Sequence, residues 1–253
     1  MIRLASILVP LIGLGLPGAP AQARDDTALC EGTAIVTGTR EDTRAEGLAH
    51  ALRDVLVKRS GDPALLHDPR VDPLGPQAAD MVEDYLYLDR MSGEPKHDEQ
   101  GTRDRPYTLI ARFAPAKIDA ALAELGDRPW LAERPELLPR IMITDAKRAS
   151  FPLSADGDND ERQRQALLAA AERYGMRVVL EPLGQATTDM PANTLVVTGT
   201  LRWSDTDPGW AGTWRIGRDR ASTWGIKGVS FDDAFRDLVW GAMAVASGHE
   251  RPH

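Results

Sequence analysis

The first 23 residues predict an export signal. The chain that follows contains only one cysteine, so it cannot form an internal disulfide to stabilise its fold outside the cytoplasm. Arg3 precedes an apolar run from Leu4 to Leu16, and Ala21-Gln22-Ala23 has the small-x-small pattern that signal peptidases cleave. We therefore expect cleavage after Ala23 and a periplasmic mature protein. Because Cys30 has no second cysteine to pair with, the fold must depend on hydrophobic cores instead of disulfides.

Composition limits the kinds of partner that such a chain binds. The full chain of 253 residues carries 30 basic and 38 acidic side chains, a net charge of −8. The basic residues are scattered, with no run longer than Lys58-Arg59, so nucleic acid and anionic lipid are disfavoured as partners. No apolar run after the signal approaches the ~20 residues of a membrane span. We therefore expect no membrane span after cleavage, no nucleic-acid binding, and one large domain or two small ones.

Hydrophobic periodicity divides the mature chain into two modules, residues 24–135 and 136–248, followed by a polar tail, 249–253. Pro129, Pro135 and Pro139 mark the boundary between the modules. The elements predicted for the first module are a strand (33–37), a helix (42–60), a loop (62–76), a short helix (77–84), two strands joined by a long loop (85–88 and 107–113) and a helix (116–125) that Gly126 ends.

The second module is predicted to contain more strands than the first. Its expected elements are a strand (140–144), a helix (161–174), a strand (178–180), three further strands (195–203, 210–216 and 223–226) and a helix (230–246) that begins with a Ser230 cap. The pattern indicates an α+β fold of two small mixed modules. In the second module, a tryptophan-rich antiparallel sheet is expected to pack on the C-terminal helix.

Sequence motifs provide no catalytic residue, metal ligand or cofactor site. Gly13 to Gly18 match a dinucleotide-binding fingerprint, but they lie inside the export signal without a preceding strand. His249 and His253 have the i, i+4 spacing of a zinc site, but a polar tail offers no helix to hold them. We therefore expect no enzymatic activity. An unrecognised hydrolase would require an aspartate or glutamate in a cleft with a raised pKa.

Tryptophans are concentrated near the C-terminus, where five of six lie between residues 203 and 240. Strand alternation places Trp203, Trp210, Trp214 and Trp224 on sheet faces together with aliphatic residues. Two interpretations follow from this pattern. The rings either form the core beneath the last helix, which is the favoured interpretation, or they provide a platform for stacking on sugars.

Trp240 lies off the main apolar stripe of the last helix, on the same side as Met243. Either this helix is buried on a second side, against the first module, or the two residues anchor a partner protein. Tryptophan and methionine are both enriched at protein interfaces. Trp240 and Met243 are therefore the candidate partner-binding residues.

The segment from Leu125 to Pro135 resembles a signature of the family named domain of unknown function 2066 (DUF2066), on the residues Gly126, Trp130, Arg134 and Pro135. The helix from Arg44 to Gly61, and the strands from Gly199 to Trp224 with Trp210 and Trp214, are similar to other parts of that family. The resemblance implies an exported proteobacterial protein in which the signature residues are structural. It brings no activity, cofactor or catalytic residue.

Two hypotheses for function follow. The first is a non-enzymatic protein of the periplasm that binds another protein of the cell envelope or assists envelope assembly. The alternative is a module that binds glycan or peptidoglycan on the tryptophan face. In either case Arg134, between two prolines, is expected to bind main-chain carbonyls at the module junction instead of a ligand.

Overall fold

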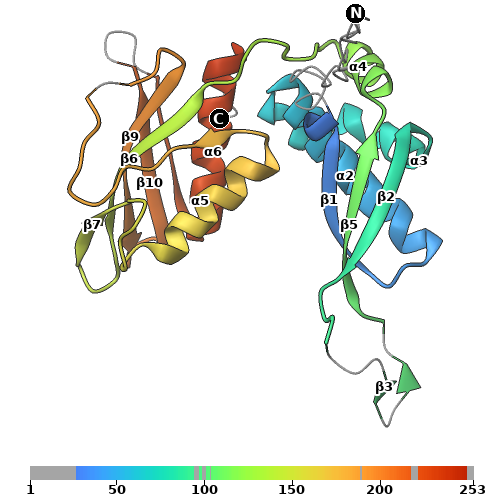
Figure 1. Ribbon diagram of the computed structural model, residues 1–253, viewed down its shortest axis with the longest axis horizontal. Coiled ribbons are helices and arrows are strands. Elements are labelled where there is room, and N and C mark those ends of the chain that lie inside the picture. The colour runs from blue at the N-terminus through green and yellow to red at the C-terminus, as the bar shows by residue number, and fades with distance from the viewer. Residues whose placement is uncertain are drawn as a thin grey trace, which may run out of the picture.

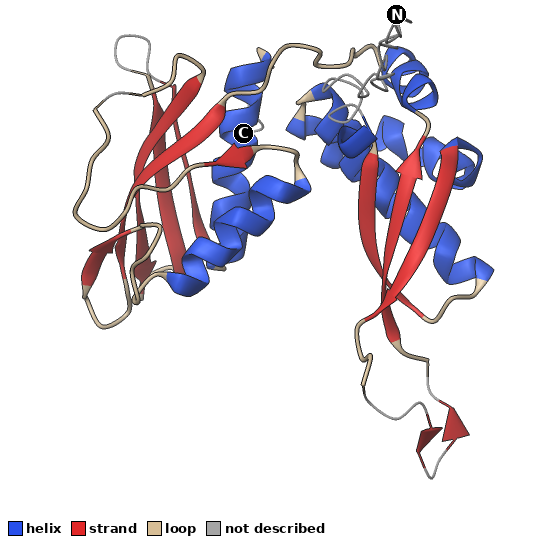
Figure 2. Ribbon diagram, in the orientation of Figure 1, coloured by secondary structure: helices blue, strands red, loops and turns tan. Residues whose placement is uncertain are grey.

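The computed structural model describes residues 27–93, 104–188, 190–217 and 222–249, together with the backbone of 97–98 and 101–102. The predicted export signal, His253 and most of the predicted polar tail therefore lie outside the described residues. The fold is α+β, as predicted. Two sheet-and-helix modules lie side by side, and the polypeptide crosses between them once through an extended linker (Figures 1 and 2).

The N-terminal module is a three-stranded antiparallel sheet in the order β1-β5-β2, with α2 packed across one face. Its elements are β1 (Glu31–Thr37), α2 (Glu41–Ser60), η1 (Pro63–Leu66), η2 (Pro69–Gln77), α3 (Ala78–Met81), β2 (Val82–Asp89), β5 (Pro106–Phe113) and α4 (Pro115–Glu124). Gly32 and Gly47 allow α2 to approach the sheet closely, because a Cβ at either position would collide with its neighbours across the interface. A short hairpin of β3 (His97–Asp98) and β4 (Gly101–Thr102) extends from the far end of this sheet (Figure 1).

The segment 62–76, expected to be a loop, instead forms two 3₁₀ helices, η1 and η2. Each helix begins with an aspartate whose side chain accepts a hydrogen bond from the main chain two residues later: Asp62 from Ala64 N at 2.9 Å and Asp68 from Arg70 N at 2.8 Å. In each case a proline follows at the first helical position, where its missing N–H removes no hydrogen bond. The prolines that suggested a loop thus initiate short helices.

The C-terminal module is a six-stranded mixed sheet, with strand order β11-β10-β9-β6-β7 and β8 paired to β6. Its elements are β6 (Glu136–Thr144), β7 (Ser150–Pro152), α5 (Glu161–Arg173), β8 (Arg177–Val178), β9 (Thr194–Ser204), β10 (Gly209–Ile216), β11 (Ser222–Val229) and α6 (Phe231–Ser247). The pairs β9–β10 and β10–β11 are antiparallel, whereas β6 runs parallel to β9 and β8. The predicted tryptophan-rich antiparallel sheet therefore forms the β9–β11 part of a larger sheet.

β6 begins four residues earlier than predicted and passes through Pro139. Leu137 O accepts from Val179 N beside β8, and Ile141 O accepts from Leu153 N beside β7. Pro139 lies between these two residues and faces the same edge of β6, beyond the end of β8 and before the start of β7. Because its nitrogen faces this unpaired edge, the missing N–H removes no hydrogen bond from the ladder with β9 on the other side.

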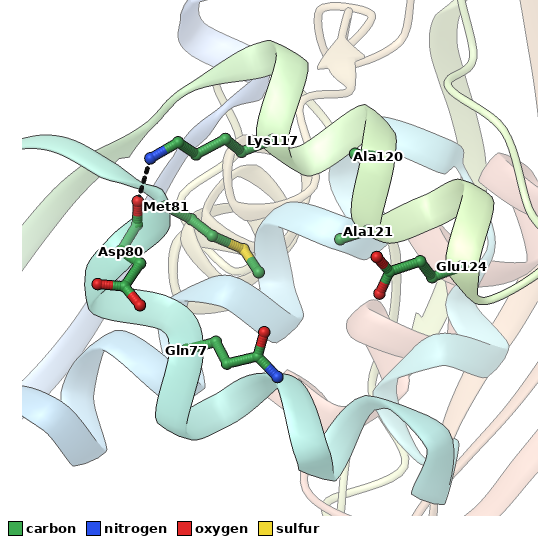
Figure 3. Close-up of a pocket in the computed structure, with 7 residues that line it drawn as sticks. All are labelled: Gln77, Asp80, Met81, Lys117, Ala120, Ala121 and Glu124. Carbon is green, nitrogen blue, oxygen red and sulfur yellow. Dashed lines mark hydrogen bonds between the residues drawn. The ribbon is translucent and has the colours of Figure 1, made fainter.

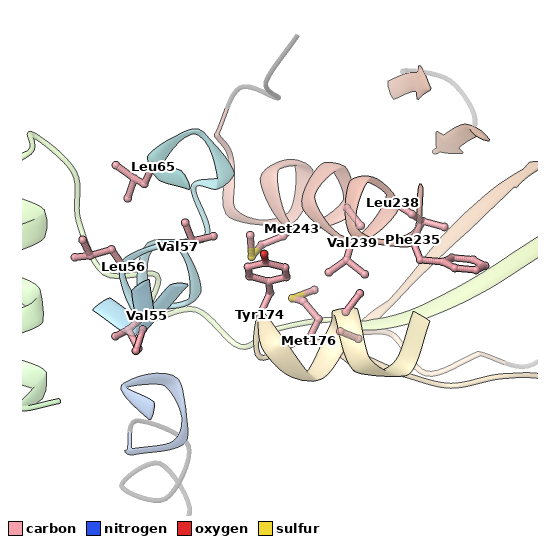
Figure 4. Close-up of a cluster of buried hydrophobic side chains, with 14 of the residues drawn as sticks. Val55, Leu56, Val57, Leu65, Tyr174, Met176, Phe235, Leu238, Val239 and Met243 are labelled. Atoms are coloured by element: carbon pink, nitrogen blue, oxygen red, sulfur yellow. The ribbon is translucent and has the colours of Figure 1, made fainter. Parts of the chain in front are cut away.

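One hydrophobic cluster runs through both modules. Helices α5 and α6 cover the face of the larger sheet that is turned towards the N-terminal module (Figure 1). Val57 and Leu65 of the N-terminal module lie opposite Tyr174 and Met243 of the C-terminal module in this cluster (Figure 4). Cys30 is fully buried. Because buried side chains are continuous across the boundary, the two modules are packed against each other as well as linked.

None of the helices in the described part of the chain has the length and apolar character required to cross a lipid bilayer.

Candidate functional site

A cleft of about 610 Å³ lies between the two modules. Residues 31–35 of β1 line it from the N-terminal module, and Ala169, Glu172 and Arg173 of α5 line it from the C-terminal module. Figure 1 shows β1 as the strand of the smaller sheet nearest to α5. Ligand sites commonly have volumes of roughly 300–1,000 Å³ and often lie at domain boundaries. The cleft is therefore large enough to accept a ligand or a short stretch of peptide.

β1 presents an open hydrogen-bonding edge to this cleft. Among the described strands it pairs only with β5, since the sheet order is β1-β5-β2. Phe113 N donates to Cys30 O at 2.9 Å and Gly38 N donates to Arg105 O at 2.8 Å, so the even-numbered residues of the strand face β5. The odd-numbered residues direct their main-chain N–H and C=O groups outward, and these residues are Glu31, Thr33, Ile35 and Thr37.

A polar stripe on α2 lies beside this edge. His50, Asp54 and Lys58 follow one another at intervals of four residues, which places them on one side of the helix, and all three line the cleft. Lys58 Nζ donates to Glu31 O at 2.7 Å and thereby satisfies one outward-facing carbonyl of β1. Burial lowers the pKa of Lys58, because removal from water disfavours its charged form.

An ion pair between Arg173 and Asp54 connects the two walls of the cleft. Arg173 donates to Asp54 Oδ2 from Nε at 2.8 Å, and its Nη2 lies 2.7 Å from the same oxygen. Asp54 is almost entirely buried. Burial raises the pKa of Asp54, and the attraction of Arg173 offsets only part of that effect. The hydrolase hypothesis requires a carboxylate with a raised pKa in a cleft, and Asp54 fits that description. Its ion pair with Arg173, however, indicates that Asp54 joins the two modules.

We expect the substitution Asp54→Asn to change how the free energy of unfolding depends on pH. Because the pKa of Asp54 lies above its ordinary value of 3.8, the folded protein binds this proton more tightly than the unfolded chain does. As the pH falls through the raised pKa towards 3.8, the wild type should gain stability relative to the variant. Urea unfolding of both proteins from neutral pH to about pH 4 measures this difference. A difference that stays constant over the range contradicts the expectation.

The face of the N-terminal sheet opposite α2 carries exposed apolar side chains next to the open edge. Ile35 of β1 is 65% exposed, and Leu86 and Leu88 of β2 are 47% and 52% exposed. Thr108 of β5 pairs with Ile35 on one side and with Leu88 on the other, so these side chains lie on one face. An added strand beside β1 would extend this apolar face.

A smaller hollow of about 240 Å³ lies between α3 and α4 (Figure 3). Gln77 and Asp80 line it from one side, and Lys117 and Glu124 line it from the other. The ammonium group of Lys117 donates to the main-chain carbonyl of Asp80, which ties the two helices together. These groups serve the packing of surface helices, and we assign no function to the hollow.

The signature residues of the linker lie at the module junction. Gly126 adopts a left-handed conformation (φ 80°) just after α4, and Pro135 directly precedes β6. Arg134 donates to the carbonyl of Lys58 in one module and to that of Tyr174, at 3.4 Å, in the other. Its guanidinium carbon lies 4.2 Å from the centre of the Trp130 ring. Arg134 therefore has the carbonyl-binding role expected from its position.

Arg134 is an unusual cation because it is largely removed from water. Burial, with a smaller contribution from the nearby charge of Arg59, lowers the pKa of Arg134 to about 10. Arg59 is itself paired with Asp119, whose Oδ1 accepts from Nε at 2.8 Å. The junction thus places two guanidinium groups in a nearly dry environment, where each depends on its acceptors.

The tryptophans of the larger sheet pack beneath α6. Trp214 is fully buried, stacks on Phe235 with ring centres 6.4 Å apart, and donates from Nε1 to Asp237 Oδ2 at 2.9 Å. Trp224 fills the space beside Gly241 of α6. The other two rings are partly buried, Trp210 against Phe231 and Trp203 against Trp210. This arrangement is a core beneath the last helix, and it leaves the glycan hypothesis without a fully exposed aromatic platform.

Trp240 and Met243 lie between the two modules. The Trp240 ring contacts Tyr174, just after α5, and His67, just after η1, with ring centres 5.8 Å and 6.4 Å apart. Met243 is fully buried beside Tyr174 and Val57 (Figure 4). A partner therefore has no access to Met243 in this fold. The predicted partner-binding pair is corrected to a contact between the modules, which was the other interpretation of this side of the helix.

Comparison with known families gives a match between residues 23–131 and a family model described as Domain of unknown function (DUF8605). The matched region contains the N-terminal module and the start of the linker. This is a different family from DUF2066, so the resemblance inferred from the short motifs was wrong. Those motifs consist of a helix-ending Gly126 and the junction residues Trp130 and Arg134, whose packing roles are not specific to one family. Neither the curated proteins nor the solved structures include a match to this chain.

Sequence reasoning missed the residues that build the cleft. Asp54 and Arg173 are distant in the chain and meet only when the modules pack together. One signal was present in the sequence, since His50, Asp54 and Lys58 form a polar stripe along one side of α2. Such a stripe is ordinarily the solvated face of an amphipathic helix, so it did not point to a cleft by itself.

Proposed function

We propose that this protein is an exported, non-enzymatic binding protein of the cell envelope that captures an extended segment of a partner protein along β1. The observation that carries the proposal is the open edge of β1, which faces the cleft between the modules. Export is supported by the pattern of residues 1–23, and non-enzymatic action by the absence of a recognised catalytic motif in the sequence. The kind of partner follows from the chemistry of the edge.

Strand addition is the binding mode that such an edge favours. An extended peptide placed beside β1 would form main-chain hydrogen bonds with the N–H and C=O groups of Thr33 and Ile35. The carbonyl of Glu31 is already bonded to Lys58 Nζ, which limits pairing at that end of the strand. The wall of α5 on the opposite side of the cleft would shield the added strand from water.

Side chains around the edge indicate the sequence that the partner segment carries. Neighbouring side chains of an added strand would alternate between the two faces of the sheet. On the open face they would lie beside Ile35 and continue the apolar surface of Leu86 and Leu88. On the other face they would meet His50 and Lys58 of α2. We therefore expect a segment with apolar residues at alternate positions and polar residues between them.

A photoreactive residue at position 35, introduced in cells that export the protein, tests this function. We expect the crosslinks to map to one extended segment of a partner protein. A photoreactive residue at position 142 is the control, because Met142 is also exposed (45%) but lies on the sheet of the other module. Equal yields of the same partner at both positions, or crosslinks scattered over many proteins, would contradict specific capture at β1.

We also expect Thr33→Pro to reduce partner capture about tenfold, because proline removes an outward N–H worth roughly 0.5–1.5 kcal/mol and obstructs the incoming strand. The ladder with β5 keeps its bonds, since the N–H of residue 33 faces away from it. The matched variant Thr33→Val keeps the N–H and should bind normally. Binding of the crosslinked segment, synthesised as a peptide, measures both variants by calorimetry. Equal affinities for the two variants would rule out strand addition at this edge.

A further inference from the structure

Three potential metal ligands from distant parts of the chain meet at the junction of the modules, away from the cleft. Asp62 follows α2, Asp127 follows α4 and His249 follows α6. One ligand atom from each residue lies within 4.8 Å of those from the other two. Three separate chain segments thus bring two carboxylates and an imidazole to one point.

Asp127 carries the strongest indication that this cluster binds something. Its side chain is 13% exposed, and its Oδ1 accepts from Arg128 N at 2.7 Å and lies 3.1 Å from His249 Nε2. Its second oxygen, Oδ2, is buried and has no hydrogen-bond partner within the described part of the chain. A buried carboxylate oxygen without a partner is unfavourable unless an unseen cation or water satisfies it.

Ser247 lies against the other nitrogen of His249. The Ser247 hydroxyl is within hydrogen-bonding distance of the main-chain carbonyls of Gly61, at 2.9 Å, and Ala244, at 3.2 Å, and its oxygen lies 2.9 Å from His249 Nδ1. When the hydroxyl donates to a carbonyl, its oxygen accepts from Nδ1–H. In that tautomer the Nε2 lone pair faces Asp127 Oδ1, and a cation between the two acceptors would stabilise the pair.

From this geometry we infer that Asp62, Asp127 and His249 bind a divalent transition-metal cation of the Zn²⁺ type. Ligand bonds of about 2.0–2.1 Å in a tetrahedral site place neighbouring ligand atoms about 3.3 Å apart, close to the 3.1 Å between His249 and Asp127. The Ser247 contact supplies the outer hydrogen bond that metal-bound histidines usually make. Ca²⁺ and Mg²⁺ prefer all-oxygen sites, so the imidazole selects against them.

The same residue types also occur in hydrolase triads, but this arrangement differs from one. In a triad the serine hydroxyl donates to the histidine, whereas Ser247 donates to main-chain carbonyls. A Cβ at Gly61 would collide with both Ser247 and the ring of Trp130, so the surroundings of Ser247 are tightly packed. The cluster therefore serves to bind a cation, which would clamp the end of α6 to the N-terminal module.

Titration of the metal-free full mature chain with ZnCl₂ tests the inference. We expect one Zn²⁺ per chain by calorimetry and a thermal midpoint that rises with ZnCl₂ concentration. MgCl₂ and CaCl₂ should produce neither effect. His249→Gln and Asp127→Asn should weaken Zn²⁺ binding at least 100-fold, whereas Asp158→Asn, an exposed acid of another loop, should leave it unchanged.

Two results would overturn the inference. The first is a wild-type protein whose thermal midpoint and heat of titration do not respond to ZnCl₂ at millimolar concentration, which would leave His249 and Asp127 as a hydrogen-bonded pair without a metal. The second is an equal Zn²⁺ response in wild type and His249→Gln, which would place the metal elsewhere. Asp62→Asn distinguishes a loss of metal binding from a loss of folding, because the amide oxygen of asparagine keeps the cap that Asp62 forms with Ala64 N.

Discussion

Replacing Trp214 by alanine is expected to destabilise the protein by about 3–5 kcal/mol, a large part of the stability of a domain. The ring is fully buried between the sheet and α6, and it stacks on Phe235. Truncation would remove this burial, leave a cavity beneath the helix and take the Nε1 donor from Asp237. Chemical unfolding, followed by circular dichroism, measures the change in the free energy of unfolding.

Thr213→Ala is the matched control for this substitution. Thr213 lies on the same strand, next to Trp214, but its side chain is on the exposed face of the sheet. We expect its loss to change the free energy of unfolding by no more than about 0.5 kcal/mol. A loss below about 1 kcal/mol for Trp214→Ala would mean that the ring is not part of the core, and it would restore the glycan hypothesis.

Replacing Arg134 by alanine is expected to cost about 2–4 kcal/mol. Arg134 donates to carbonyls of both modules, and hydrogen bonds from charged groups contribute roughly 1.5–3 kcal/mol each. Its stacking on Trp130 would also be lost. Because these contacts join the modules, we expect urea unfolding of the variant to separate into two transitions, one for each module.

Arg134→Lys and Arg177→Ala are the controls that isolate this role. Lysine keeps the charge but does not reach both carbonyls in a fork, so Arg134→Lys should recover only part of the lost stability. Arg177 is 67% exposed, and its removal should be close to neutral. If Arg134→Ala unfolds in one transition with wild-type stability, Arg134 does not hold the modules together.

Local signals in the sequence predicted most of the regular structure. Apolar residues at helical spacing indicated α2 and α6, and Ser230 caps α6 by accepting from Asp233 N at 3.1 Å, as its capping pattern indicated. Alternation along three segments indicated β9, β10 and β11, and Trp210 pairs with Trp203 across two of them. These features depend on neighbouring residues, which is why one sequence suffices to predict them.

Proline produced two of the errors in the fold prediction; the predicted helix 77–84 was also too long, since α3 ends at Met81 and β2 begins at Val82. The cluster of prolines between residues 62 and 76 suggested a loop, but Pro63 and Pro69 begin 3₁₀ helices. Pro139 suggested that a strand begins after it, but the proline lies within β6 at a gap between two neighbouring strands. In both cases the effect of proline depends on whether its N–H was needed, which is a property of the folded structure.

The candidate sites were predicted less well than the fold because they are built from distant residues. Asp54 meets Arg173 across the cleft, and Asp62 meets Asp127 and His249 at the junction. The sequence pattern pairs His249 only with His253, its neighbour at i, i+4 spacing. Neither of the two combinations that the fold creates has a spacing that a single sequence reveals, because module packing brings both together.

Amide hydrogen exchange of the protein without residues 1–23, measured by NMR at Thr33 and Ile35, tests the open edge of β1 most directly. In the free protein we expect these two amides to exchange much faster than those of Gly32 and Ala34, which face β5. On addition of the crosslinked partner segment as a peptide, exchange at Thr33 and Ile35 should slow to the rate of their neighbours. Protection of both amides in the free protein, or exchange that the peptide leaves unchanged, would contradict capture by strand addition.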